Sequence, residues 1–245
     1  MAGQQSSDAE TAALWFNPPD NGPGERRALS RERVVAEALA IIAADGAQAL
    51  SMRALAAHLG VVPGALYRYV RGKEQLHDLV LDAVLGETDC RTNAGEPWTL
   101  QIATLARRLR SVLESHPGTA ALLKTRDPLS PTSLDLAEAF LTPLLAAGLP
   151  GREAALAFRV IYDYTLGFAL ADPTSPAEQR LRDTATREKL RAFFRALPAS
   201  RFPALAAYGV YAWDGDRDQR FAAGLEALLR GLQANMRPPG ASGES

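Results

Sequence analysis

The sequence is poor in the residue types that build covalently cross-linked or metal-stabilised folds. Its 245 residues include one cysteine, Cys90, and three histidines. A single cysteine excludes an internal disulfide framework and a zinc site made of cysteines. The histidines, His58, His77 and His116, are too far apart in sequence for a metal-spaced pair. We therefore expect no bound metal and no cofactor.

Long apolar runs and catalytic motifs are missing as well. No apolar stretch is long enough to span a bilayer, and the chain does not start with a signal peptide. These two absences predict a cytoplasmic protein without a membrane partner. The sequence contains neither a glycine-rich phosphate loop nor a nucleophile elbow. An enzyme is the alternative class of protein, but because these motifs are missing we expect no catalytic activity.

The charge that is present is unevenly distributed. The whole chain has a formal net charge of −1, but residues 26–73 carry eight basic and three acidic side chains, a net charge of +5. A basic segment of this kind is expected where a protein meets the phosphates of DNA. The alternative is that these charges only keep a small domain in solution.

Residues 51–73 predict two short helices around a tight turn. Ser51 stands at an N-cap position, and Gly60 stands where the first helix must end. Pro63 suits the first turn of the second helix, where its missing N–H is no loss. The spacing of Leu55, Leu59 and Leu66 places them towards one small core. This pattern is typical of a helix-turn-helix, whose second helix fits the major groove of B-DNA.

The rest of the chain predicts an all-α fold. Ser30 caps an expected helix over about 31–44, and another helix begins at Lys73. Pro143 should kink or split the helix that contains it. The further expected helices span about 98–115, 119–123, 133–147, 151–171, 184–197 and 216–235, with a loop between 172 and 183. The expected domains are a disordered tail 1–25, a helix-turn-helix domain 26–72, a larger helical domain 73–236 and a disordered tail 237–245.

The order of these residues resembles a known family. The motif comprises Leu29-Ser30-Arg31, Ala38-Leu39, Gly46, Leu50 to Ala56, Leu59-Gly60-Val61, Leu66-Tyr67, Val70, Lys73 and Leu76. It is similar to the DNA-binding domain of TetR-family transcriptional regulators. The segments 148–172 and 224–232, together with Thr125-Arg126, resemble the C-terminal domain of the tetracycline repressors in that family. The resemblance covers roughly residues 29–236.

The resemblance implies roles for residues of the helix-turn-helix. Side chains at the matching positions mostly hold the DNA backbone, and here they are Ser51, Tyr67, Tyr69 and Lys73. Arg53 matches a base-reading position, and its planar fork can bind O6 and N7 of guanine. The start of the recognition helix, Pro63, Gly64 and Ala65, carries no side-chain donors and permits close approach or contact with thymine methyl groups. Arg68 is a further candidate for base or phosphate contact, and Arg26 and Arg27 could form a basic arm. For Tyr67, a packing role is the alternative.

The resemblance also implies an effector domain, with altered chemistry. Leu122 stands where the tetracycline repressors have a metal-binding histidine, and Ala171 stands where they have a glutamate near the metal. Leu105 replaces an asparagine, and Asp89 occupies a histidine-bearing position. An apolar wall cannot coordinate a hard cation, so we expect a mostly apolar effector rather than magnesium-bound tetracycline. The candidate pocket residues are Leu105, Leu109, Leu122, Thr125, Arg126, Tyr162 and Tyr164. Each of them could instead be an ordinary core residue.

Two expected helices have more apolar surface than one partner can cover. They lie near 152–171 and 217–235, and paired across a two-fold axis they would form a four-helix bundle. The sequence therefore predicts a homodimeric, ligand-responsive repressor that binds palindromic operator double-stranded DNA and a small-molecule effector. The alternative is a constitutive architectural DNA-binding protein without an effector.

Overall fold

The fold is helical throughout the part of the chain that the structure describes. The structure is a computed structural model and describes residues 29–123, 126, 129–171, 179, 183–211 and 215–236, among which there is no strand. This confirms the predicted all-α class. Contacts divide the chain into two units, Met1–Leu170 with Pro238–Ser245, and Ala171–Arg237. None of the described helices is long and apolar enough to cross a membrane.

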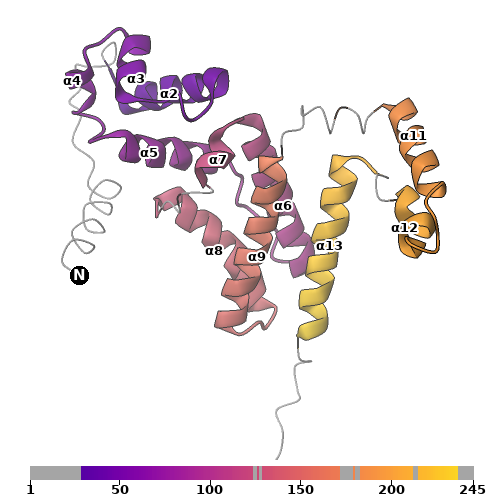
Figure 1. Cartoon of the computed structure of the whole chain (residues 1–245). Coiled ribbons are helices and arrows are strands. Elements are labelled where there is room, and N and C mark those ends of the chain that lie inside the picture. Colours follow the sequence, from indigo (N-terminus) through magenta and orange to yellow (C-terminus); the bar gives the residue numbers. More distant parts are fainter. Residues whose placement is uncertain are drawn as a thin grey trace, which may run out of the picture. The chain divides into compact units, whose positions relative to one another are not determined.

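The first unit contains eight described helices (Figure 1). Helix α2 begins after Ser30, whose Oγ accepts a hydrogen bond from the main-chain N of Arg33 at 3.2 Å. This predicted cap gives a hydrogen-bond acceptor to a main-chain N–H of the first turn that would otherwise have none. The bounds are α2 Arg31–Asp45, α3 Met52–Leu59, α4 Pro63–Leu66, α5 Lys73–Gly86, α6 Trp98–Ser115, α7 Thr119–Leu123, α8 Pro131–Ala146 and α9 Gly151–Leu170.

Helix α5 connects the two halves of this unit. It packs against α2, which precedes it in the sequence, and against α6, α7 and α8, which follow it. Its apolar side chains Leu76, Val80 and Val84 are fully buried, so both halves share its core residues. A helix buried on several sides needs several partners, and α5 has them.

Helices α6, α8 and α9 pack against one another and form the larger core. Of the predicted kink or split at Pro143, the split is wrong, because helix α8 runs unbroken through this proline to Ala146. Pro143 lies in the last turn, where its missing N–H removes only one helical hydrogen bond. Its neighbours Phe140 and Leu144 are fully buried, and their packing keeps the last turn helical.

The second unit contains a helical hairpin and one long helix. Helix α11, Thr184–Arg195, contacts α12, Pro203–Tyr208, and the 3-10 turn η1, Gly209–Tyr211. Helix α13, Arg217–Asn235, begins with a capping box between Asp216 and Gln219. The expected helices are observed at nearly the expected bounds, whereas α12 and η1 were not expected from the sequence. Most of the loop expected between 172 and 183 lies outside the described residues, as do both tails.

Two glycines in this fold have the same left-handed backbone conformation in different surroundings. Gly118, in the turn between α6 and α7, and Gly148, after α8, both have φ of +90°. A Cβ on Gly118 would lie 3.0 Å from Cγ2 of Ile42 in α2, whereas a Cβ on Gly148 would meet nothing within 4 Å. The turn before α7 therefore approaches the end of α2 too closely for any side chain.

We expect Gly118→Ala to destabilise the protein more than Gly148→Ala. The left-handed conformation costs a non-glycine residue about 1–2 kcal/mol, and this cost is common to both variants. Overpacking against Ile42 should add about 1–3 kcal/mol for Gly118→Ala alone. Urea unfolding of both variants measures the difference. Equal losses would contradict the close contact between the turn and α2.

Candidate nucleic-acid interface

The predicted helix-turn-helix is formed by α3, α4 and the turn between them. The Ser51 Oγ accepts a hydrogen bond from the N–H of Ala54 at 3.1 Å and so caps α3. Gly60 ends α3 in the left-handed region, with φ of 69° and ψ of 29°. The N–H of Val61 donates to the oxygen of Ala56 at 3.0 Å, which closes the turn. Pro63 then occupies the first position of α4, as the sequence predicts.

Helix α4 is only four residues long, and its neighbours hold it in place. Leu66 is fully buried, and Val70 is 1% exposed in the turn that follows. The N–H groups of Tyr69 and Val70 both donate to the oxygen of Leu66, at 2.9 and 3.0 Å. These contacts leave Pro63 and Gly64 on the surface, while Ala65 is half-buried.

The side chains predicted to reach DNA are mostly exposed. Arg53 on α3 and Arg68 after α4 are exposed, and Tyr67 is 56% exposed, so packing occupies less than half of its side chain. The Arg68 guanidinium lies 6.0 Å from the centroid of the Tyr69 ring, which orients both groups. Exposed cations and phenol hydroxyls on short adjacent segments are suited to phosphate oxygens and base edges.

Lys73 continues this surface at the start of α5. Its side chain is exposed at the helix N-terminus, where the helix dipole also favours an anion. Just before it, the N–H of Arg71 donates to Oε1 of Gln75 at 2.6 Å and fixes the entry to α5. The predicted arm residues Arg26 and Arg27 lie outside the described residues.

The candidate effector residues lie on helices of the larger core. Leu105 and Leu109 on α6 are fully buried, Leu122 on α7 is 7% exposed and Tyr162 on α9 is 9% exposed. Helix α9 contacts both α6 and α7, so the structure brings these side chains into one region. Their burial fits a pocket wall and an ordinary core equally well. Thr125 lies outside the described residues.

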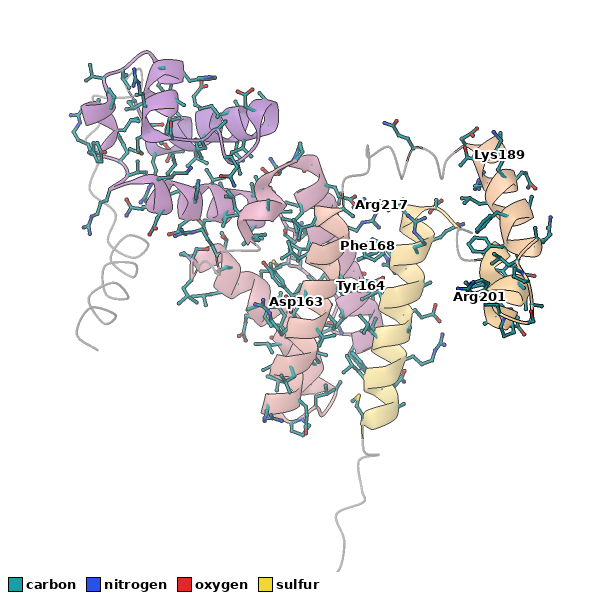
Figure 2. The ribbon with its side chains drawn as sticks, viewed as in Figure 1. Asp163, Tyr164, Phe168, Lys189, Arg201 and Arg217 are labelled. Atoms are coloured by element: carbon teal, nitrogen blue, oxygen red, sulfur yellow. The ribbon has the colours of Figure 1, made fainter. Side chains whose placement is uncertain are left out.

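Tyr164 and Phe168 form an aromatic pair one turn apart on α9 (Figure 2). Their ring centroids are 5.1 Å apart, and the Arg110 guanidinium of α6 lies 5.7 Å from the Phe168 centroid. The Arg110 Nε donates to Oε1 of Glu114 at 2.8 Å, and the Arg110 side chain is only 7% exposed. A buried cation is therefore stabilised by a carboxylate and by an aromatic face inside this domain.

Arg126 binds a carboxylate on α5. Its Nε and Nη2 donate to the two carboxylate oxygens of Asp78, at 2.8 and 3.2 Å. One turn further along α5, Oδ1 of Asp82 accepts from the N–H of Thr132 at 3.2 Å, and the Thr132 hydroxyl donates to the Asp82 main-chain oxygen at 2.9 Å. We call these two contacts the α5 clasp, since they fix Arg126 and Thr132 to the helix that follows the helix-turn-helix.

Asp89 is held by arginines. The Arg91 Nε donates to its Oδ1 at 2.8 Å, and these hydrogen bonds lower the pKa of Asp89 to about 2. Arg108 of α6 approaches the same carboxylate at 3.5 Å. In the described part of the chain, no three His, Cys, Asp or Glu side chains gather as a metal site would require.

Sequence reasoning missed the α5 clasp and the buried Arg110. The spacing of Asp78 and Asp82 does place both carboxylates on one side of a helix, which was a usable signal. Their partners, however, lie 48 and 50 residues away along the chain. No periodicity connects positions so far apart.

Comparison with known proteins places both parts of the chain in one family. A family described as "Bacterial regulatory proteins, tetR family" matches residues 34–80, and "Tetracyclin repressor-like, C-terminal domain" matches residues 92–236. An HTH-type transcriptional regulator of Saccharopolyspora erythraea is 33% identical over 231 residues, with 94% of each chain covered. The HTH-type transcriptional repressor DrrR1 of Streptomyces coeruleorubidus is 31% identical, with 90% of this chain and 83% of that protein covered.

A solved structure agrees in fold over most of the chain. ActR of Streptomyces coelicolor in complex with actinorhodin is 31% identical and superposes with a TM-score of 0.73, with 84% of this chain and 97% of that chain covered. The matches to both family domains and to full-length relatives agree with the capped α3–α4 geometry. The chain belongs to the TetR family of DNA-binding transcriptional regulators.

Proposed function

We propose that this protein is a homodimeric repressor that binds palindromic operator DNA and leaves it when a small, mostly apolar effector binds. Residues 26–72 would contact DNA, and residues 73–236 would bind the effector and the second subunit. The observation that carries this proposal is the double attachment of α5. Its first residue lies beside the helix-turn-helix, and two of its carboxylates, those of Asp78 and Asp82, hold Arg126 and Thr132.

The contacts of α5 provide a mechanism by which effector binding could weaken DNA binding. A displacement of Arg126 and Thr132 by an effector would pull on Asp78 and Asp82 and so move the helix that carries Lys73. Such a movement would change the distance between the two DNA-binding units of a dimer, and half-site spacing limits that distance. An effector can act in this way only if it binds the DNA-free form more tightly than the DNA-bound form.

Exposed apolar side chains support the proposed dimer. On α9, Leu156 is 51% exposed and Val160, one turn later, is 48% exposed. On α13, Gly224, Leu228 and Leu232 repeat every four residues and are half-buried. Apolar stripes on two helices are suited to a four-helix bundle across a two-fold axis.

The apolar lining supports the proposed effector class. Leu105, Leu109 and Leu122 offer no oxygen or nitrogen ligands, and Ala171 has no side-chain carboxylate. The relative ActR has been solved with actinorhodin bound. A few polar groups within an apolar site are usual for small-molecule pockets.

We expect Arg53→Ala and Lys73→Ala to weaken DNA binding in different ways. Loss of a bidentate base contact at Arg53 should cost about 1–3 kcal/mol on the operator and relax sequence preference. Loss of a phosphate contact at Lys73 should weaken binding to all sequences and reduce the salt slope by about one unit. Titrations of operator and random DNA at several salt concentrations measure both effects.

Arg107→Ala is the matched control, because this exposed arginine lies on α6 and outside the helix-turn-helix. Its operator affinity should equal that of the wild type. Equal losses on operator and random DNA for Arg53→Ala would remove the base-reading role of that residue.

We expect Leu156→Glu to weaken the dimer, because a charge would be buried at the proposed interface. Leu145→Glu on α8 is the control, since Leu145 is 50% exposed and Leu156 is 51% exposed. Sedimentation equilibrium of both variants measures the effect. A wild-type protein that stays monomeric and folded at high concentration would reject the four-helix-bundle interface.

The proposal as a whole is tested by a DNA-release assay on an operator identified by footprinting the region upstream of the gene. Actinorhodin and a panel of apolar natural products should include a compound that releases the protein. Tetracycline with magnesium should not, because Leu122 and Ala171 cannot replace a metal ligand and its supporting carboxylate. Magnesium-dependent release by tetracycline would show that the assignment of the effector class is wrong.

A further inference from the structure

A buried histidine, His77, lies near the start of α5. The residue is 9% exposed, and its Nε2 has no hydrogen-bond partner among the described residues. It follows Lys73 by four residues, so the two side chains are neighbours on the helix surface. A neutral imidazole can stay in such a place at the cost of one unmade hydrogen bond. An imidazolium would bury a charge together with an N–H donor that has no acceptor.

The charges around this imidazole are already balanced. Four charged side chains act on it, the cations of Lys73 and Arg126 and the carboxylates of Glu74 and Asp78. Arg126 is held beside it by the two hydrogen bonds to Asp78, at 2.8 and 3.2 Å. A proton on His77 would therefore add a positive charge that no carboxylate compensates. Burial, more than the neighbouring Lys73 and Arg126, lowers the pKa of His77, and the opposing effects of Asp78 and Glu74 are smaller.

The other helices packed against α5 direct their charges elsewhere. Helix α7 contains no ionisable side chain. Arg31 of α2 acts on Asp82, further along α5. Asp135 of α8 and Arg108 of α6 act on Cys90, beyond the end of α5. The described residues of these helices thus leave the buried imidazole to the four charges above.

The start of α5 has few other attachments. Gly72 occupies the N-cap position and has no side chain that could accept a hydrogen bond from the first turn. Apart from the bond between Arg71 and Gln75, the turn is joined to the core by the buried Leu76 and by the imidazole one residue later. Movement of that imidazole into water would therefore release the turn that carries Lys73.

We propose that His77 is an acid-sensitive switch in the first turns of α5. A proton on the imidazole drives the side chain into water and loosens the helix start that carries Lys73. The effect on operator binding rests on the proposed function, in which Lys73 holds a DNA phosphate, whereas the effect on the helix does not.

The direction of the pH dependence follows from the burial of the neutral form. Histidines of the unfolded chain have a pKa of about 6.5, and the lowered pKa of His77 means that the folded protein takes up this proton less readily. The stability that the neutral imidazole permits is therefore complete above about pH 6.5. It is lost as the pH falls from there towards the pKa of the folded state.

The test compares the full-length wild type with His77→Gln and His58→Gln. Glutamine is polar and does not titrate, and His58 of α3 is the control because it is exposed. Between pH 7.5 and 5.5 the wild type and His58→Gln should lose about 2–4 °C more in melting temperature than His77→Gln. Other titrating groups, such as His116 at 2.8 Å from Glu87, are common to all three proteins and cancel in the comparison.

Amide hydrogen exchange of the wild type tests the switch without any substitution. After correction for the intrinsic exchange rates, the protection of residues 73–78 should fall at pH 5.5 relative to pH 7.5, while residues 79–85 should keep theirs. In His77→Gln the protection of residues 73–78 should be the same at both pH values.

Two outcomes would overturn the switch. One is a melting profile of His77→Gln that runs parallel to that of the wild type, and the other is unchanged protection of residues 73–78 in the wild type. Operator affinity is measured separately at pH 7.5 and 6.0, and the wild type should weaken about threefold to tenfold more than His77→Gln. Equal weakening, with the melting profiles as expected, would contradict the phosphate contact proposed for Lys73 and not the switch.

Discussion

The way in which α5 is held is the constraint on which the rest of the first unit depends. Its buried side chains complete the core of the helix-turn-helix through α2 and the core of the larger domain through α6, α7 and α8. Its polar side is fixed by the α5 clasp, in which Asp78 binds Arg126 and Asp82 binds Thr132. Charge-assisted and bidentate contacts are directional, so they limit how α5 can tilt or slide against Arg126 and Thr132. The orientation of the residues proposed to contact DNA follows from that of α5.

The helix-turn-helix was predictable because its signals are local. Ser51, Gly60 and Pro63 each act on the main chain within a few residues, as caps and a helix start, and the structure places all three as expected. The boundaries of α6 and α7 could be predicted in the same way, from the Pro and Gly residues beside them. For Pro143 the local signal was misleading, because the packing of Phe140 and Leu144 outweighs one missing hydrogen bond.

The larger domain was less predictable because its specific contacts are long-range. Arg126 was expected in a pocket from its resemblance to a known position, and its bond to Asp78 could not be read from spacing. Arg110 reads in sequence as one more basic residue on an amphipathic helix, yet it is buried against Phe168 and Glu114. Burial of a polar group depends on which helices meet, and the sequence of a single helix does not contain that information.

The brevity of α4 has a consequence for how this regulator could change its target. A single helical turn is far too short to be stable alone. The conformational entropy lost in forming the first turn exceeds what its one hydrogen bond contributes. Its conformation is therefore imposed by Leu66 and Val70 from the core. A graft of these four residues into another scaffold would not carry with it the DNA preference proposed for them. Conversely, a core substitution that touches no nucleotide could retune the preference by tilting the turn, which makes interior positions a route by which new operator sequences can be acquired in evolution.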